Sequence, residues 1–200
     1  ISHNNITAVL ELNNGHIWLG SRGHGIDVID PSIGVIRSYL PEKSQSSGLQ
    51  NGYINALAQS DNGTVWVGTH DGLYAFTEKT QTFKKFTEKD GMNANTVNFI
   101  LTSLSGDLWI ATSQGLNSFN PVTQHFSTYT LKDEPDKMME KYIKLIAQQA
   151  DGTLWLGTDH GLYQLPPNQS KLIHIVHQPE DKYSISHNTI TGLLVDIDDN

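Results

Sequence analysis

The sequence predicts an all-β protein assembled from repeated four-stranded antiparallel sheets. One short phrase with tryptophan at its second position occurs four times, at Ile17–Gly20, Val65–Gly68, Leu108–Ala111 and Leu154–Gly157. The tryptophans are 48, 43 and 46 residues apart, so the chain is an array of units about 46 residues long. In each unit a turn glycine follows the start of the first strand at one fixed interval. These turn glycines are Gly15, Gly63, Gly106 and Gly152.

The second unit shows the strand pattern most clearly. Its first segment alternates small and apolar side chains, as expected of a strand near a crowded axis, and later segments are β-branched or aromatic. The turn at Ser60–Gly63 carries Asp, Asn and Gly, which favour tight hairpins. The four expected strands are 54–59, 64–69, 73–76 and 83–86.

The other units repeat this pattern with small variations. Their first strands are expected at 6–9, 97–100 and 143–146. Their third strands begin at Gly25, Gly115 and Gly161. A helical period is visible only in Glu134–Tyr142, an insertion before the fourth unit.

Radial stacking is the architecture that such units favour. A four-stranded meander has two apolar faces, and sheets packed around an axis bury both, as in a β-propeller. We expect blades at about 1–47, 48–91, 92–137 and 138–184. Residues 185–191 restate residues 1–7, so 185–200 is expected to be the first strand of a fifth blade. The chain begins with Ile1, and we expect a piece of a longer protein and of a larger ring.

Composition narrows the classes of function. The formal net charge of −8 argues against nucleic-acid binding and against docking on anionic lipid. The chain has no cysteine, hence neither disulfides nor thiolate chemistry. It contains no run of 18 apolar residues, so we expect no membrane contact by this segment.

The phrase at residues 61–74, DNGTVWVGTHDGLY, resembles the two-component regulator propeller repeat. It recurs at 105–117 and 151–163, and the likeness extends over essentially the whole chain. Ala111 replaces the usual glycine, and the turn at Ser21–Gly25 has one extra residue.

The resemblance implies a location and a role. In that family the repeats form extracytoplasmic sensors of bacterial histidine kinases, hybrid kinases and diguanylate cyclases, generally as seven-bladed propellers. Members often recognise oligosaccharides. The resemblance therefore implies a periplasmic, non-catalytic sensor module with a small-molecule or oligosaccharide ligand.

The tryptophans have two possible roles. Aromatic faces can stack on sugars, but a residue that recurs at one position of every unit is expected to pack between blades. We therefore expect Trp18, Trp66, Trp109 and Trp155 to be structural, together with the turn glycines.

No metal or cofactor is expected. His174 and His177 lie three residues apart in an expected outer strand, where they would point to opposite faces. The segment Asp196–Asn200 resembles a calcium loop, but it falls where each unit has an acidic hairpin turn.

The better candidates for binding are polar residues that vary at fixed positions. Turns between second and third strands, together with the loops between blades, emerge on one face of a propeller, which is the pattern of a ligand surface on a fixed scaffold. The turn residues are Arg22, His24, His70, Asp71, Ser113, Gln114, Asp159 and His160. The loops add His3, Asn4, Asn51, Asn93 and Asn95, with Pro41–Gln50 and Leu131–Lys141 as longer candidates.

Two other functions stay open. Streptogramin lyases are also propellers with short Trp- and Gly-marked repeats, and they use a histidine and acidic residues with Mg²⁺. A protein-interaction platform without a small ligand is the third hypothesis. The exposed blade edges also predict self-association, by ring closure, by pairing of two chains, by dimerisation within the parent protein, or by exchange of the duplicate strands 1–9 and 185–194.

Overall fold

The computed structural model describes residues 1–129, 142–167 and 172–196. These residues form four four-stranded antiparallel sheets, each made of four consecutive strands, so the predicted all-β propeller architecture is confirmed. Blade 1 holds β1 (Ile6–Glu11), β2 (Ile17–Ser21), β3 (Ile26–Asp30) and β4 (Gly34–Tyr39). Blade 2 holds β5 (Ile54–Gln59), β6 (Val65–Thr69), β7 (Leu73–Thr77) and β8 (Thr82–Phe86). Blade 3 holds β9 (Val97–Thr102), β10 (Leu108–Thr112), β11 (Gly115–Asn120) and β12 (His125–Tyr129). Blade 4 holds β13 (Leu145–Gln148), β14 (Leu154–Gly157), β15 (Leu162–Leu165) and β16 (Ile173–Ile175).

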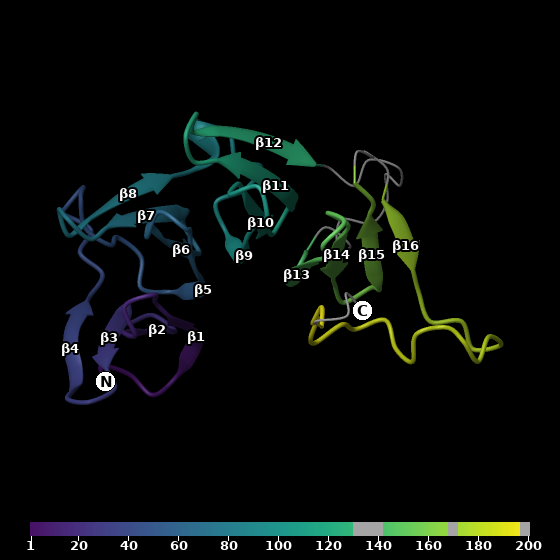
Figure 1. Ribbon diagram of the computed structural model, residues 1–200, viewed down its shortest axis with the longest axis horizontal. Helices are drawn as coiled ribbons and strands as arrows, with labels where there is room; N and C mark the ends of the chain where they lie inside the picture. Colours follow the sequence, from purple (N-terminus) through teal and green to yellow (C-terminus); the bar gives the residue numbers. More distant parts are fainter. Residues whose placement is uncertain (130–141, 168–171, 197–200) are drawn as a thin grey trace.

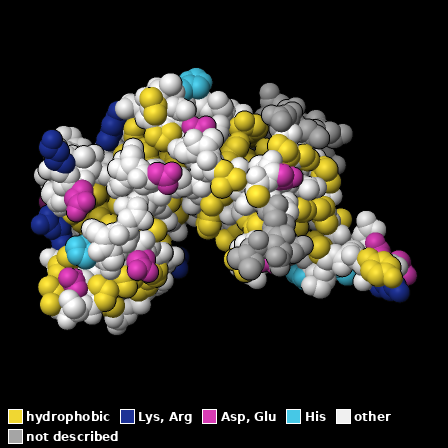
Figure 2. Space-filling model, viewed as in Figure 1, with side chains coloured by type: hydrophobic (Ala, Val, Ile, Leu, Met, Phe, Trp, Pro, Cys, Tyr) yellow, Lys and Arg dark blue, Asp and Glu magenta, His cyan; other side chains and the backbone are white. Residues whose placement is uncertain are grey.

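The four sheets follow one another in an open arc (Figure 1). The first strands β1, β5, β9 and β13 lie on the inside of the arc, and the fourth strands lie on the outside. Consecutive first strands contact one another, as expected when sheets pack radially. Hydrophobic side chains gather on the surface over blades 3 and 4 and again over blade 1 (Figure 2).

The hydrophobic core lies between consecutive blades. Trp18 is 3% exposed, and its ring lies 5.5 Å from Tyr39 of its own blade and 5.0 Å from Phe76 of blade 2. Trp66 repeats this arrangement one blade further on, with its ring 5.5 Å from Phe119 of blade 3. Such tilted and edge-on aromatic pairs add stabilisation beyond the apolar area that they bury.

A glycine two residues after the tryptophan sets how closely the next blade approaches. A Cβ atom on Gly20 would lie 2.5 Å from Ile54 Cγ2, and one on Gly68 would lie 2.6 Å from Val97 Cγ1. The first residue of each following strand therefore occupies the space that a side chain would need. Blade 3 has Ala111 at this position, and it packs in one cluster with Ile143.

Two expected strand positions are wrong. The first strand of blade 4 begins at Leu145, and Ile143 precedes it as a fully buried anchor. Residues 185–196, where a fifth inner strand was expected, form no strand in the described part of the chain. An antiparallel strand needs a run of backbone hydrogen bonds to a neighbouring strand, and the described residues show no such run here.

The segment nevertheless docks at the expected place. The Ile190 N–H donates to the Thr158 carbonyl over 2.9 Å, and a Cβ atom on Gly157 would lie 2.9 Å from Ile190 Cγ2. Ile190 thus occupies the anchor position that Ile54 and Val97 occupy in earlier blades.

The expected helical segment Glu134–Tyr142 falls outside the described residues except for Tyr142. A 3₁₀ turn at Glu88–Asp90 was not predicted.

Candidate functional site

Stacked rings collect on the face where the turns between second and third strands emerge. His3 and His24 of blade 1 stack with centroids 4.0 Å apart and planes within 9°. Tyr53 and His70 of blade 2 stack at 4.9 Å and 13°. A β-bridge joins Arg22 to Tyr53, so the two pairs belong to neighbouring loops. We call these five residues the ring platform.

The extra residue in the blade 1 turn explains how the ring platform is held. The N–H groups of Gly23 and Gly25 both donate to the Gly52 carbonyl, over 2.8 and 3.1 Å. Gly23 has φ +95°, and the Tyr53 ring lies over its backbone, 3.5 Å from where a Cβ atom would be. Gly52 has no room for a side chain, because a Cβ atom there would lie 2.4 Å from the Gly23 carbonyl oxygen. Backbone bonds between two blades therefore fix the rings in place.

The ring platform offers both donors and aromatic faces to a ligand. Arg22, His24, Tyr53 and His70 are exposed, and Tyr53 is 45% exposed. His3 Nδ1 accepts the Asn5 N–H over 3.0 Å, which places the imidazole proton of the neutral ring on Nε2. Such a surface can stack on a planar or apolar ligand face while the guanidinium and imidazole groups donate hydrogen bonds.

Asp71, by contrast, is an internal polar contact of blade 2. Its carboxylate pairs with Lys85 at 2.7 Å and accepts the Tyr74 hydroxyl over 3.0 Å and the Thr69 hydroxyl over 2.9 Å. Burial and the neighbouring Asp71 charge raise the pKa of Tyr74, so its hydroxyl remains a donor. Asp71 therefore stabilises the turn from below the platform.

The candidates of blade 3 belong to a buried amide network. Asn93 Oδ1 accepts the Thr112 hydroxyl over 2.6 Å and the Asn117 amide over 2.7 Å, and Asn117 is fully buried. The Asn93 amide donates to the Gln114 carbonyl over 3.4 Å. The Gln114 side chain is exposed, and the Ser113 N–H donates to the Thr96 carbonyl over 3.1 Å.

In blade 4, Asp159 pairs with Lys144 at 2.5 Å. The His160 N–H donates to the Thr158 hydroxyl over 3.0 Å, and the His160 carbonyl lies 2.9 Å from His174 Nε2. His160 Nδ1 is buried and has no hydrogen-bond partner among the described residues. In the described ranges no hydrogen bond, ion pair or ring contact joins Gln114, Asp159 or His160 to the ring platform.

The remaining candidates serve mainly to close loops. Asn51 Oδ1 accepts the Tyr53 N–H over 2.8 Å, and Asn95 Oδ1 accepts the Glu88 N–H over 2.9 Å. Asn4 is exposed, and Leu49 anchors the loop Pro41–Gln50 in the core. The loop Leu131–Lys141 lies outside the described residues. The turn glycines Gly15, Gly63, Gly106 and Gly152 have φ between +82° and +93°.

Sequence reasoning missed Tyr53 as a platform residue. It stands one position before Ile54, where the first unit has Asn5. The available signal was an aromatic side chain at a loop position where the first and third units have Asn5 and Thr96, although the fourth unit also has a tyrosine there, Tyr142.

The two histidines of the expected outer strand, His174 and His177, have separate partners. His174 stacks on Tyr163 at 4.1 Å, whereas His177 Nδ1 lies 2.7 Å from the Ile185 carbonyl. Within the described ranges no group of three or more His, Cys, Asp or Glu side chains is placed to hold a metal ion. The calcium-like segment Asp196–Asn200 lies outside the described residues apart from Asp196. No helix in the described part of the chain is long and apolar enough to cross a membrane.

Comparison with known proteins agrees with this fold. The two component regulator propeller family matches residues 1–23 and 48–71. The chain is similar to the extracellular domain of the hybrid two component system BT3049 from B. thetaiotaomicron, with 29% identity and a TM-score of 0.68 over 80% of this chain and 21% of that one. It is also similar to the extracellular domain of the one component system BT4673 from that organism, with 23% identity and a TM-score of 0.79 over 99% of this chain and 26% of that one.

Virginiamycin B lyase from Staphylococcus aureus is a third similar structure. The sequence identity with this chain is 16% and the TM-score is 0.66, over 88% of this chain and 56% of the lyase. At that identity the likeness shows the propeller fold alone. No curated protein sequence matches the chain.

The family match at residues 1–23 and 48–71 agrees with the resemblance that the tryptophan phrases indicated. The chain spans between a fifth and about a quarter of the extracellular domains that it resembles.

Proposed function

We propose that this propeller is the ligand-binding part of an extracytoplasmic sensor in a bacterial transmembrane signalling protein of the two-component type. The observation that carries the proposal is the combination of family repeats with a likeness to an extracellular sensor-system domain at 29% identity. The periplasm is the compartment that this role implies. The module itself performs no catalysis, and its ligand shifts the arrangement of the parent protein.

The ring platform is the surface on which we place the ligand. It presents stacked rings and cationic or neutral donors, held by backbone bonds between blades 1 and 2. An oligosaccharide suits such a surface, because sugar rings have an apolar face for stacking and hydroxyl groups that accept hydrogen bonds.

Titration of the complete extracytoplasmic region with a panel of oligosaccharides and small metabolites tests this function. We expect saturable binding by at least one compound, and competition for that binding by chemically related compounds. Absence of binding, together with signalling that survives deletion of the repeats, would overturn the proposal.

An enzyme of the lyase type is the alternative to be separated by experiment. The lyase likeness shows the fold alone, so it assigns no catalytic residue to this chain. An assay of streptogramin opening with and without Mg²⁺ discriminates between the two functions. We expect no turnover in either condition, and Mg²⁺-dependent turnover would favour the lyase.

A further inference from the structure

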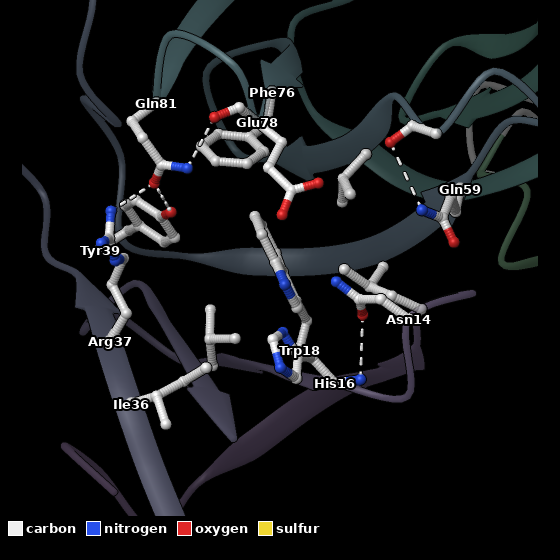
Figure 3. Close-up of a pocket in the computed structure, with 14 residues that line it drawn as sticks. Asn14, His16, Trp18, Ile36, Arg37, Tyr39, Gln59, Phe76, Glu78 and Gln81 are labelled. Carbon is white, nitrogen blue, oxygen red and sulfur yellow. Dashed lines mark hydrogen bonds between the residues drawn. The ribbon is translucent and has the colours of Figure 1, made fainter. Parts of the chain in front are cut away.

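A cavity lies between blades 1 and 2 (Figure 3). Its lining includes the turns between first and second strands, which lie at the opposite end of the strands from the turns that carry the ring platform. Its volume is about 180 Å³, and its walls come from the β1–β2 and β5–β6 turns, from β4 and from the β7–β8 turn. That volume equals roughly six water molecules, which is enough for one small organic molecule.

A bulge that blade 2 lacks adds an apolar side chain to the cavity wall. In blade 1, Val28 pairs with Arg37 and Ile29 pairs with Val35, so Ile36 is an extra residue in β4. The corresponding strands β7 and β8 pair without a register shift. The bulge places Ile36 on the cavity wall, and Phe76 of blade 2 also lines the cavity.

The cavity wall also carries a hydrogen-bond donor, the Trp18 indole N–H, that has no acceptor among the described residues. The indole N–H groups of Trp66 and Trp155 donate over 2.7 Å to Ser60 and Gln149, each six residues earlier in its blade. In blade 1 that position is Leu12, which has no acceptor atom. The Trp18 N–H therefore forms no hydrogen bond with any described residue and remains available on the cavity wall.

Two opposite charges stand at the cavity without pairing. The Arg37 guanidinium donates one hydrogen bond to Gln81 Oε1 and keeps its other N–H groups free of described partners. The Glu78 carboxylate forms no hydrogen bond or ion pair within the described ranges, although its backbone carbonyl accepts the Gln81 amide over 2.7 Å. Figure 3 shows both side chains on the cavity wall, with Trp18 beside Glu78.

Tyr39, which also lines the cavity, lies near both charges. Burial raises the pKa of Tyr39, the Arg37 guanidinium lowers it, and the Glu78 charge raises it. A ligand that carries both signs would complement a cation and an anion that face one cavity without pairing with each other.

From the unpaired Arg37 and Glu78 beside an apolar cavity wall, we infer that this cavity binds a zwitterionic α-amino acid with an apolar side chain. The ligand carboxylate lies against Arg37, its ammonium group lies against Glu78, and its side chain packs against Ile36 and Phe76. This inference concerns a site separate from the ring platform and stands whether or not the platform binds a sugar.

A series of related probes tests the inference on the intact chain. L-leucine carries both charges, leucinamide lacks the carboxylate, and 4-methylpentanoate lacks the ammonium group. We expect L-leucine to bind most tightly and each analogue to bind about fivefold more weakly in calorimetric titration, since each lost pair lies in a solvated pocket. D-glucose serves as an uncharged probe and is expected not to bind here.

Variants then assign each charge to its partner. We expect Arg37→Gln to weaken L-leucine about fivefold while leaving leucinamide unchanged, and Glu78→Gln to weaken L-leucine while leaving 4-methylpentanoate unchanged. Lys84→Gln is the matched control, because Lys84 donates to Gln124 over 2.5 Å at the corresponding place in blade 2. Thermal melts confirm that each variant is folded.

Three results would overturn the inference. They are the absence of L-leucine binding up to about 10 mM, equal binding of D-glucose, and an equal effect of both variants on every probe. The first two would show that the cavity does not select a zwitterion, and the third would show that the charges act only through the fold.

Discussion

At the scale of single residues, Trp18 and Trp66 pack between consecutive blades and are buried, whereas Trp109 and Trp155 are half-buried. Trp66 is 3% exposed among the aromatic rings of blades 2 and 3, whereas Trp155 of blade 4 is half-buried. Trp66→Ala is expected to lower the free energy of unfolding by about 3–5 kcal/mol. Urea denaturation measures this loss, and Trp155→Ala, as control, should cost less. Retained stability in Trp66→Ala would contradict the packing role.

A buried carboxylate makes the stability of blade 1 depend on pH. Asp27 is 2% exposed and accepts hydrogen bonds from the Ser2 N–H, the Ser2 hydroxyl and the Ser38 hydroxyl, over 2.5, 2.9 and 2.5 Å. Burial alone would raise the pKa of Asp27, but the hydrogen bonds from Ser38 and Ser2 outweigh it and lower the pKa from its ordinary value of 3.8.

The sign of the pH effect follows from that lowered pKa. A depressed folded-state pKa contributes stability above the unfolded value, and that stability is lost as the pH falls through the folded value. Asp27→Asn is therefore expected to cost about 1–3 kcal/mol at pH 7. The two proteins should converge in melts below the ordinary pKa of 3.8. A difference that is independent of pH would show that charge plays no part.

At the scale of elements, the sequence predicted the strands and turns that are common to all blades. The strands of blade 2 begin and end within one residue of their expected positions, because turn glycines and alternating apolar residues mark both ends. The polar contact made two positions after the glycine of each third strand, Gly25 in blade 1 and Gly115 in blade 3, could not be predicted. It is Asp27 with Ser2 in blade 1 but Asn117 with Asn93 in blade 3, so no repeated letter marks it.

The candidate site was predictable only in part, because its contacts also differ from blade to blade. The face was inferred from the position of the turns, but the roles of the turn residues depend on partners far away in the sequence. The Asp71 carboxylate bonds to Lys85 and Tyr74 of its own blade. Tyr53 lies in the ring platform next to Gly52, whose carbonyl accepts N–H groups from the longer blade 1 turn.

The close approach of blades gives a prediction at this scale. Gly68→Ala is expected to destabilise the protein by about 1–3 kcal/mol, because the new methyl group meets Val97, which is fully buried and cannot move aside. Ala111→Gly in blade 3 is the control and should cost about 0.5–1 kcal/mol, the usual effect of glycine in a strand. Denaturant unfolding measures both, and an unaffected Gly68→Ala variant would contradict this account of blade spacing.

At the scale of the whole molecule, the arc exposes an interblade face at blade 1. Val65 and Val67 of β6 are buried against blade 1, whereas the corresponding Ile17 and Leu19 of β2 are half-buried. Val9 on the inner strand is 64% exposed. We expect this chain to self-associate in solution through such faces, because apolar patches of this kind rarely stay open.

Light scattering after gel filtration measures that association. We expect a mass above that of one 22.2 kDa chain, and a shift toward the single-chain mass in Leu19→Lys, which places a charge on the open face. Lys84→Gln on the outer strand of blade 2 serves as the control. A single-chain mass for the unmodified protein at all concentrations would rule out association through the open faces.

Ligand sensing at the ring platform is the central claim, and signalling by the complete parent protein tests it most directly. The measurement is the output response to the oligosaccharide panel with Tyr53→Ala, and with Tyr183→Ala as control, since Tyr183 is 85% exposed on a distant loop. The account predicts that Tyr53→Ala raises the ligand concentration for half-maximal output by about thirtyfold, as for loss of a central aromatic anchor, while Tyr183→Ala responds normally. A folded Tyr53→Ala protein with an unchanged response would contradict it.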